Sequence, residues 1–180
     1  MSNLRLIGLC SVLSVLAACH PLQRPADPLG FVYDFETDAE LDRISWDCGQ
    51  LYARDSSFVT SGHWGLRVRF LQGENLGLKF NGLFADWSGF DALVFDVRNP
   101  QSRPVPLLLH LGLYRDGEFV LVSLPVPVAA GDHHKRIPLH SLRYPGDGAP
   151  ADLSLVLSAR LVIPEPVRGT QLFFDDIHLE

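Results

Sequence analysis

Basic and aromatic residues recur on the polar sides of alternating segments, where their side chains suit the recognition of a sugar. An aromatic ring offers a flat face for stacking, and an arginine fork holds a carboxylate through two parallel hydrogen bonds. Arg67, Arg98, His110 and Tyr114 are therefore candidate ligand-binding residues, with an acidic glycan as the ligand. The plainer alternative is a solvated face whose cations pair with neighbouring acids, and it stays open. These four residues can form one common site only if the first strands share a sheet.

Asp175 is notable because the alternation of its segment turns it toward the core. It shares strand parity with the apolar residues Phe173, Ile177 and Leu179. A carboxylate in such a position requires either a cation or several hydrogen-bond donors. Two arrangements follow from the residues alone: a metal ion with oxygen ligands, or backbone N–H groups that cap the carboxylate at a corner of the sheet.

Other reactive residues form no recognisable catalytic motif. His133 and His134 follow residues 131–132, where a turn is expected. They are adjacent, so their side chains face opposite ways on a strand, and with His140 they make a poor metal site. Asp147 and Glu165 are acids of the kind used in glycoside hydrolysis, but nothing in the sequence brings them together. The chain lacks a nucleophile elbow, a phosphate loop, a Cys-x-x-Cys pair and a zinc-binding helix motif. We therefore expect a protein that is not an enzyme.

The composition narrows the class of partner. The formal charge of −6 argues against nucleic acid, because phosphate binding needs a basic surface. Two of the three cysteines, Cys19 among them, lie in the N-terminal segment, which leaves Cys48 without an intramolecular disulfide partner. We expect Cys48 to be a small buried residue on a strand. The further stacking candidates are Trp46, Trp64 and Trp87, of which Trp87 is expected to pack in the core.

The first 19 residues have the pattern of a processed leader. Arg5 precedes an apolar run over residues 6–16, and two alanines then precede Cys19. The ending Leu-Ala-Ala-Cys resembles the lipobox of bacterial lipoproteins, which implies a signal peptide over residues 1–18 and a lipid on Cys19. His20 stands where that family carries Asp for inner-membrane retention, so the resemblance implies a lipid-anchored protein of the bacterial cell envelope, at the outer membrane. The alternatives are an ordinary secretory signal, or a membrane span, for which the run is too short.

The remaining chain divides into a tether and one domain. Residues 19–30, which include the lipidated cysteine, are proline-rich and extended, and the domain covers residues 31–180. Short runs that alternate apolar and polar residues, separated by Gly, Asn, Asp and Pro, predict strands with one buried face. Asp116 and Gly117 predict a tight hairpin, Pro125 and Pro127 predict an edge strand, and the one helical segment covers residues 38–44. About nine or ten strands predict an all-β, antiparallel β-sandwich.

Four segments of the domain occur in the order found in galactose-binding-like, jelly-roll carbohydrate-binding modules, and the chain resembles that family over residues 31–180. The segments are Asp34-Phe35-Glu36, the stretches over residues 61–68 and 87–99, and the closing stretch over residues 172–179. The resemblance implies a jelly-roll sandwich with adjacent first and last strands. It also implies a structural Ca²⁺ held by Glu36 and Asp175, with backbone carbonyls from the turn over residues 61–64.

Together these inferences predict an envelope-anchored, non-catalytic lipoprotein whose jelly-roll domain binds carbohydrate, with an acidic glycan favoured by the basic residues. The alternative is a structural or assembly lipoprotein that binds another envelope protein, because a module alone behind a lipid anchor fits that role too. A glycan-processing enzyme is the third and weakest hypothesis, since no reaction motif is present. The fold by itself does not decide among them, because one fold hosts many functions.

Overall fold

The structure, a computed structural model, describes residues 31–45, 48–80 and 83–180. The predicted leader, Cys19, the tether and Trp46 lie outside these ranges. Within the described residues, no helix is long and apolar enough to cross a membrane. The elements in chain order are α1 (Asp38–Asp42), β1 (Gln50–Asp55), β2 (Gly65–Phe70), β3 (Leu76–Phe80), β4 (Ala92–Asn99), β5 (Leu108–Arg115), β6 (Glu118–Pro125), β7 (Gly131–Pro138), η1 (Leu139–Ser141), β8 (Val156–Ile163) and β9 (Gln171–Leu179).

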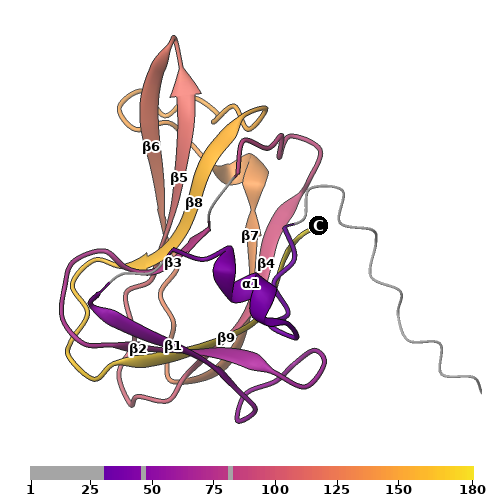
Figure 1. The fold of residues 1–180 in the computed structure, drawn as a ribbon. Coiled ribbons are helices and arrows are strands. Elements are labelled where there is room, and N and C mark those ends of the chain that lie inside the picture. Colours follow the sequence, from indigo (N-terminus) through magenta and orange to yellow (C-terminus); the bar gives the residue numbers. More distant parts are fainter. Residues whose placement is uncertain (1–30, 46–47, 81–82) are drawn as a thin grey trace, which may run out of the picture.

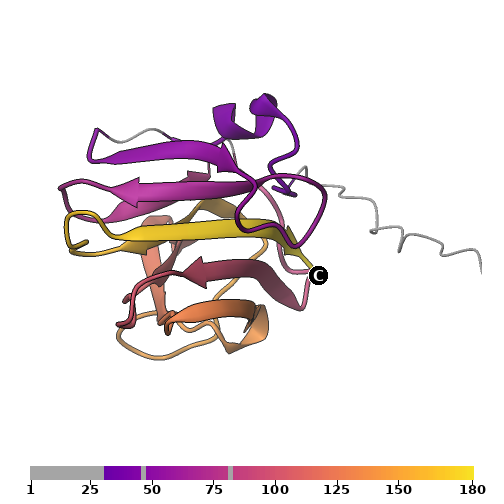
Figure 2. The same ribbon diagram turned by 90° about the horizontal axis from the view of Figure 1, so that it is seen from below.

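Two antiparallel sheets face each other and form the predicted jelly-roll β-sandwich (Figure 1). One sheet has five strands in the order β1-β2-β9-β4-β7, which lie side by side in Figure 2. The other has four strands in the order β3-β8-β5-β6. Every strand pair within these sheets is antiparallel. The all-β fold expected from the alternating sequence is confirmed.

The core forms between the sheets because each strand turns alternate side chains inward. On β2, Leu66, Val68 and Phe70 are fully buried, whereas Arg67 and Arg69 between them are exposed. The same alternation on β5 buries the leucines at positions 109, 111 and 113 and turns positions 108, 110, 112 and 114 outward. Burial of a large apolar side chain contributes about 1.5–3 kcal/mol, so this facing apolar pattern is what holds the sheets together.

The hairpin between β5 and β6 has the predicted two-residue turn. Asp116 and Gly117 adopt φ values of 54° and 86°, and Arg115 pairs with Glu118 across the turn. Two consecutive positive φ values match the right-handed twist of the flanking strands. Strand β6 then ends at Pro125 on the edge of its sheet, as its prolines predicted. The hairpin thereby fixes which residue of β6 lies opposite each residue of β5.

Three local expectations differ from the structure. The first apolar run contributes a single bridge, in which Tyr33 pairs with Ile177 on β9, so the first and last segments are adjacent although the first is no regular strand. Residues 131–132, expected as a turn, begin the long strand β7. Cys48 was expected to be buried on a strand, but it is exposed in the turn before β1. In the first two cases the pairing partner, which is distant in sequence, decides the local conformation.

Candidate functional site

The four predicted ligand-binding residues are divided between the two sheets. Arg67 lies on β2 and Arg98 on β4, both in the five-stranded sheet, whereas His110 and Tyr114 lie on β5 in the four-stranded sheet. All four alternate with core residues and therefore turn away from the sandwich. The outward faces of two packed sheets point in opposite directions, so the first strands do not share a sheet and no single surface joins the four.

Arg98 is fully engaged by groups of the protein itself. Its Nη2 donates to Asp132 Oδ2 at 2.7 Å while Nε donates to the other carboxylate oxygen, and Nη1 donates to the Ser57 carbonyl at 2.7 Å. The guanidinium also lies 4.8 Å from the centre of the Phe58 ring. The hydrogen bonds to Asp132 raise the pKa of Arg98 and lower that of Asp132. For this residue the geometry favours the paired, structural alternative.

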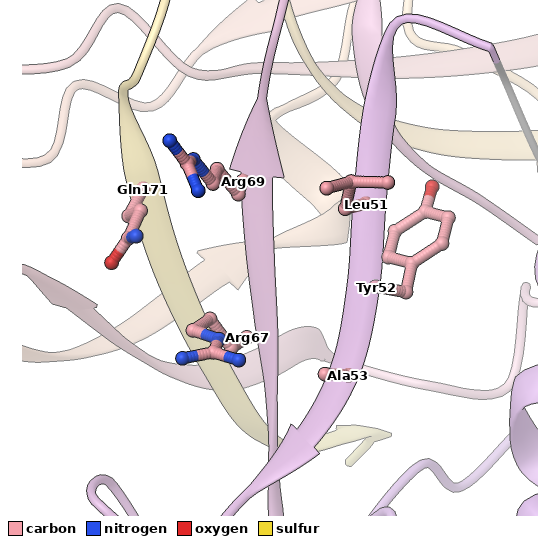
Figure 3. Close-up of a pocket in the computed structure, with 6 residues that line it drawn as sticks. All are labelled: Leu51, Tyr52, Ala53, Arg67, Arg69 and Gln171. Atoms are coloured by element: carbon pink, nitrogen blue, oxygen red, sulfur yellow. The ribbon is translucent and has the colours of Figure 1, made fainter.

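Arg67 borders a small hollow on the outward face of the five-stranded sheet (Figure 3). Its Nη1 forms an ion pair with Asp55 at 3.2 Å. The hollow measures about 140 Å³ and is lined by Leu51, Tyr52, Ala53, Arg67, Arg69 and Gln171.

The four-stranded sheet brings Tyr114 together with an aromatic residue that the sequence analysis did not single out. Phe119 on β6 lies directly opposite Tyr114, and the two side chains are 57% and 50% exposed. Gly112 on β5 lies in the next outward row of this face. An added Cβ at Gly112 would lie 2.6 Å from the Phe119 ring. Glycine at this position therefore lets the ring lie over the backbone of β5. The signal for Phe119 was present, since the predicted hairpin at Asp116 already pairs these positions.

Polar residues form another row of the same face, beyond the row of Gly112, Leu121 and Ser158. His110 lies opposite Arg160 of β8 on one side and opposite Ser123 of β6 on the other, and Arg160 in turn lies opposite Lys79 of β3. Burial, with a contribution from Arg160, lowers the pKa of His110 below its ordinary value, so the ring is predominantly neutral at pH 7. A neutral imidazole offers one donor and one acceptor. This row therefore provides directional hydrogen bonds on the same face as the aromatic pair.

Among the described residues, the outward face of the four-stranded sheet carries no acidic residue along its paired strands. Arg160 and Lys79 are its charged groups, on a protein with a formal charge of −6. The outward positions are Gly77, Lys79, Leu108, His110, Gly112, Tyr114, Phe119, Leu121, Ser123, Pro125, Ser158, Arg160 and Val162.

Asp175 and Glu36 are both capped by backbone N–H groups. Asp175 Oδ2 accepts the amides of Thr60 at 2.6 Å and Ser61 at 2.9 Å, and Glu36 Oε1 accepts those of His63 at 2.6 Å and Trp64 at 2.8 Å. The two amide hydrogen bonds lower the pKa of Glu36. Burial raises the pKa of Asp175, against the opposing effect of its donors.

Asp175 is fully buried, but not for the reason that the strand alternation of residues 173–179 suggested. Leu172, Phe174 and Ile177 belong to the core, so the alternation of β9 is interrupted between residues 174 and 177. Pairing with β4 shifts register there, and Asp176 has a φ of 51°, which is the geometry of a bulge. Burial of Asp175 comes from the turn that begins at Thr60 and covers it.

These carboxylates do not fit the calcium site that the family resemblance implied. Ca²⁺ binds oxygen atoms, and the turn between Thr60 and Trp64 presents N–H groups to Glu36 and Asp175 where carbonyl oxygens were expected. An N–H group repels a cation. Among the described residues, no group of three or more His, Cys, Asp or Glu side chains is arranged to hold a metal ion.

The remaining candidates are separated or engaged. His134 binds Asp96 at 2.8 Å, and the ring of His133 contacts the carbonyl of residue 129 at 3.0 Å. Asp147 is held by Arg115 through two hydrogen bonds rather than paired with Glu165. Of the described tryptophans, the one at position 87 is fully buried in the core, as predicted, and the one at position 64 is 40% exposed.

Sequence comparison provides no family assignment, whereas structural comparison identifies the fold. No family model matches the chain, and no curated protein matches it. The family 11 carbohydrate-binding module of a cellulosomal cellulase of Clostridium thermocellum superposes with a TM-score of 0.62 and 15% identity, covering 86% of this chain and 95% of that module. That family 11 module in complex with a β-1,3-1,4-mixed-linked tetrasaccharide matches with a TM-score of 0.55 and 14% identity, over 83% and 94% of the two chains.

An enzyme fragment also contains a similar domain. The two-module N-terminal part of xylanase 10B of Clostridium thermocellum, complexed with xylohexaose, matches with a TM-score of 0.56 and 13% identity. The match covers 83% of this chain but 28% of that one. At such low identities the likeness establishes the jelly-roll fold shared with carbohydrate-binding modules, and the residues of the face described above must carry any functional argument.

Proposed function

We propose that this protein is a non-catalytic carbohydrate-binding domain whose ligand lies on the outward face of the four-stranded sheet. The observation that carries the proposal is the exposed cross-strand pair of Tyr114 and Phe119 on the same sheet face as the polar row of His110, Arg160 and Ser123. Sugar rings present C–H faces that stack on aromatic rings and hydroxyl groups that need directional partners. This face offers both on one sheet, with the row of Gly112, Leu121 and Ser158 between them.

The arrangement supports sugar over the alternative of an envelope-protein partner. A protein interface of useful size has a continuous apolar centre with charged groups at the rim. Here Arg160 and Lys79 lie in the row between the aromatic pair and the outward residues Leu108 and Pro125, so charged groups interrupt the apolar surface on its β3 and β8 side. The family 11 module, which has the same fold, is described in complex with a tetrasaccharide.

The ligand we propose is an acidic glycan. Arg160 and Lys79 are the charged groups along the outward face, and no acid stands among the described outward positions of its strands. Arginine binds a carboxylate or sulfate through two parallel hydrogen bonds. An acidic glycan should therefore bind more tightly than a neutral one of the same length, and the difference should shrink with added salt.

The location we propose is the bacterial cell envelope, with the domain held at the outer membrane by a lipid on Cys19. The support is the leader over residues 1–18 and the Leu-Ala-Ala-Cys ending. A lipid anchor would hold the proposed glycan-binding domain next to the polysaccharides of the envelope.

A glycan array containing neutral and acidic polysaccharides, followed by calorimetry on the best ligand, tests this function. Tyr114→Ala and Phe119→Ala should each weaken binding by about 1–3 kcal/mol, roughly 5- to 150-fold, because each removes a stacking face. Trp64→Ala is the matched control, since it removes an exposed aromatic side chain outside this face. Absence of any glycan ligand, or binding that Trp64→Ala abolishes while both face variants retain it, would refute the proposed site.

A further inference from the structure

We infer that the hollow on the outward face of the five-stranded sheet is a second binding site, which takes the carboxylate or sulfate of an acidic glycan. It lies on the opposite side of the sandwich from Tyr114 and Phe119. With both sites occupied, one domain holds two glycan chains. The anion site stands on its own geometry, and only the identity of its carrier rests on the proposed function.

The strands bring two arginines to the same hollow. Arg67 and Arg69 are two residues apart on β2, so both side chains leave the same face, about 6.6 Å apart along the strand (Figure 3). Ala53 of β1 lies opposite Arg67, and its small side chain leaves the space that the hollow occupies. Gln171 of β9 lies opposite Arg69 on the other side and adds an amide that can donate.

The two arginines of the hollow form fewer ion pairs within the protein than two other arginines of the domain do. Arg98 and Arg115 each close both arms of the guanidinium on one carboxylate, Asp132 and Asp147 respectively. Arg67 instead has one ion pair, to Asp55 at 3.2 Å. Arg69 has no ion pair with any residue that the structure describes. Its two-armed donor group is therefore left for a carboxylate or sulfate from outside.

The size of the hollow limits what it can hold. Sites for ligands of drug size enclose about 300–1,000 Å³. A volume of about 140 Å³ accommodates one charged substituent and part of its ring rather than several sugars. Leu51 supplies an apolar wall beside Arg69, against which the carbon atoms of that ring can lie.

Two sites on opposite faces allow one domain to bind two glycan chains at the same time. Since β2 and β5 belong to opposite sheets, a chain bound at Arg69 and a chain bound at Tyr114 lie on opposite sides of the domain. One monomer then cross-links two acidic polysaccharide chains.

Calorimetry with a trigalacturonate, a sulfated trisaccharide and a neutral trisaccharide tests the second site. In the Tyr114→Ala/Phe119→Ala double variant, the two acidic probes should still bind and the neutral one should not. Adding Arg69→Gln should weaken the remaining binding about tenfold or more, because it removes a charge-assisted pair. Arg136→Gln is the matched control, since it removes an arginine of the same sheet that lies outside the hollow and pairs with Glu180 at 2.9 Å.

The outcomes separate this inference from the proposed function. Acidic binding that vanishes in the double variant and ignores Arg69→Gln in the otherwise unchanged protein refutes the second site and leaves the aromatic face intact. Binding that depends on Arg69 alone upholds the second site and refutes the aromatic one. A protein that binds none of the three probes refutes the second site. Turbidity of a polygalacturonate solution should rise with the protein, and either the Arg69→Gln or the double variant should abolish the rise.

Discussion

Glu36 and Asp175 hold the two ends of one turn through its backbone amides. Asp175 accepts the amides of Thr60 and Ser61, and Glu36 accepts those of His63 and Trp64. Gly62 between them has a φ of 70°, and an added Cβ would lie 2.4 Å from Glu36 Oε1. The turn is therefore closed over two carboxylates, in a manner that leaves no room for a side chain at residue 62.

The Asp175 contacts predict a large loss of stability on Asp175→Asn. Its Oδ2 atom also accepts the Thr60 hydroxyl at 3.1 Å, and an amide group would bring N–H donors against N–H donors. We expect the free energy of unfolding to fall by about 2–4 kcal/mol, measured by urea denaturation. Asp86→Asn is the control, because exposed Asp86 accepts one amide, which an asparagine oxygen can accept equally. Equal stability of the two variants would contradict the role assigned to Asp175.

The same contacts predict that calcium does not stabilise the domain. A ligand that binds only the folded state raises the melting temperature by mass action. Since N–H groups cap both carboxylates, we expect the same melting temperature in excess EDTA and in millimolar CaCl₂. A calcium-dependent rise that Glu36→Gln abolishes would show that the turn rearranges to present its carbonyl oxygens, as the family resemblance implied.

The hydrogen bonds of Asp147 predict that its carboxyl group titrates at an unusually low pH. The hydrogen bonds from Arg115, at 2.7 and 3.0 Å, lower the pKa of Asp147 from 3.8 to about 2. A lowered folded-state pKa contributes stability that is present above 3.8 and is lost as the pH falls toward 2. NMR titration of the carboxyl carbon should give a midpoint near 2, and Arg115→Gln should return it toward 3.8. An unchanged midpoint in that variant would assign the shift to the turn amide of Ala149 instead.

The backbone of Phe84 predicts a gain in stability when its side chain is removed. It has a φ of 82° and is 75% exposed, and its amide and that of Ala85 both donate to the Val156 carbonyl. That positive φ disfavours a bulky side chain, so Phe84→Gly should raise stability by about 0.5–1 kcal/mol in thermal melts.

Phe84→Ala provides the control for that experiment. It removes the ring but keeps a Cβ in the positive-φ backbone, so it should not give the gain in stability. A Phe84→Gly variant that is less stable than the parent would show that the ring packs productively in the folded state.

Cys19 predicts lipid modification in the host bacterium. The Leu-Ala-Ala-Cys ending after a short apolar run is the sequence feature that supports it. Metabolic labelling with a radiolabelled fatty acid should mark the protein, and Cys19→Ser should abolish the label and release the domain from the membrane fraction. Label retained by Cys19→Ser would rule out this anchor, whereas Cys48→Ser should leave the labelling unchanged.

The alternating residues of each segment determine, by themselves, which face of each strand is buried. Leu66, Val68 and Phe70 between exposed arginines specify the buried side of β2, because successive side chains on a strand face opposite ways. Asp116 and Gly117 likewise determine the β5–β6 hairpin, since their positive φ values are needed for a two-residue turn. These are local rules, and the sequence contains everything that they need.

Only the tertiary structure determines which strands share a sheet, and therefore which outward residues share a surface. Arg98 and His110 sit on consecutive strands with similar alternation, yet β4 and β5 belong to opposite sheets, because strand neighbours are chosen by pairing between distant segments. The amides that cap Asp175 come from residues more than a hundred positions earlier in the chain. Sequence alternation can therefore say that a side chain faces outward, but only the packing of the sheets determines which other residues share its surface.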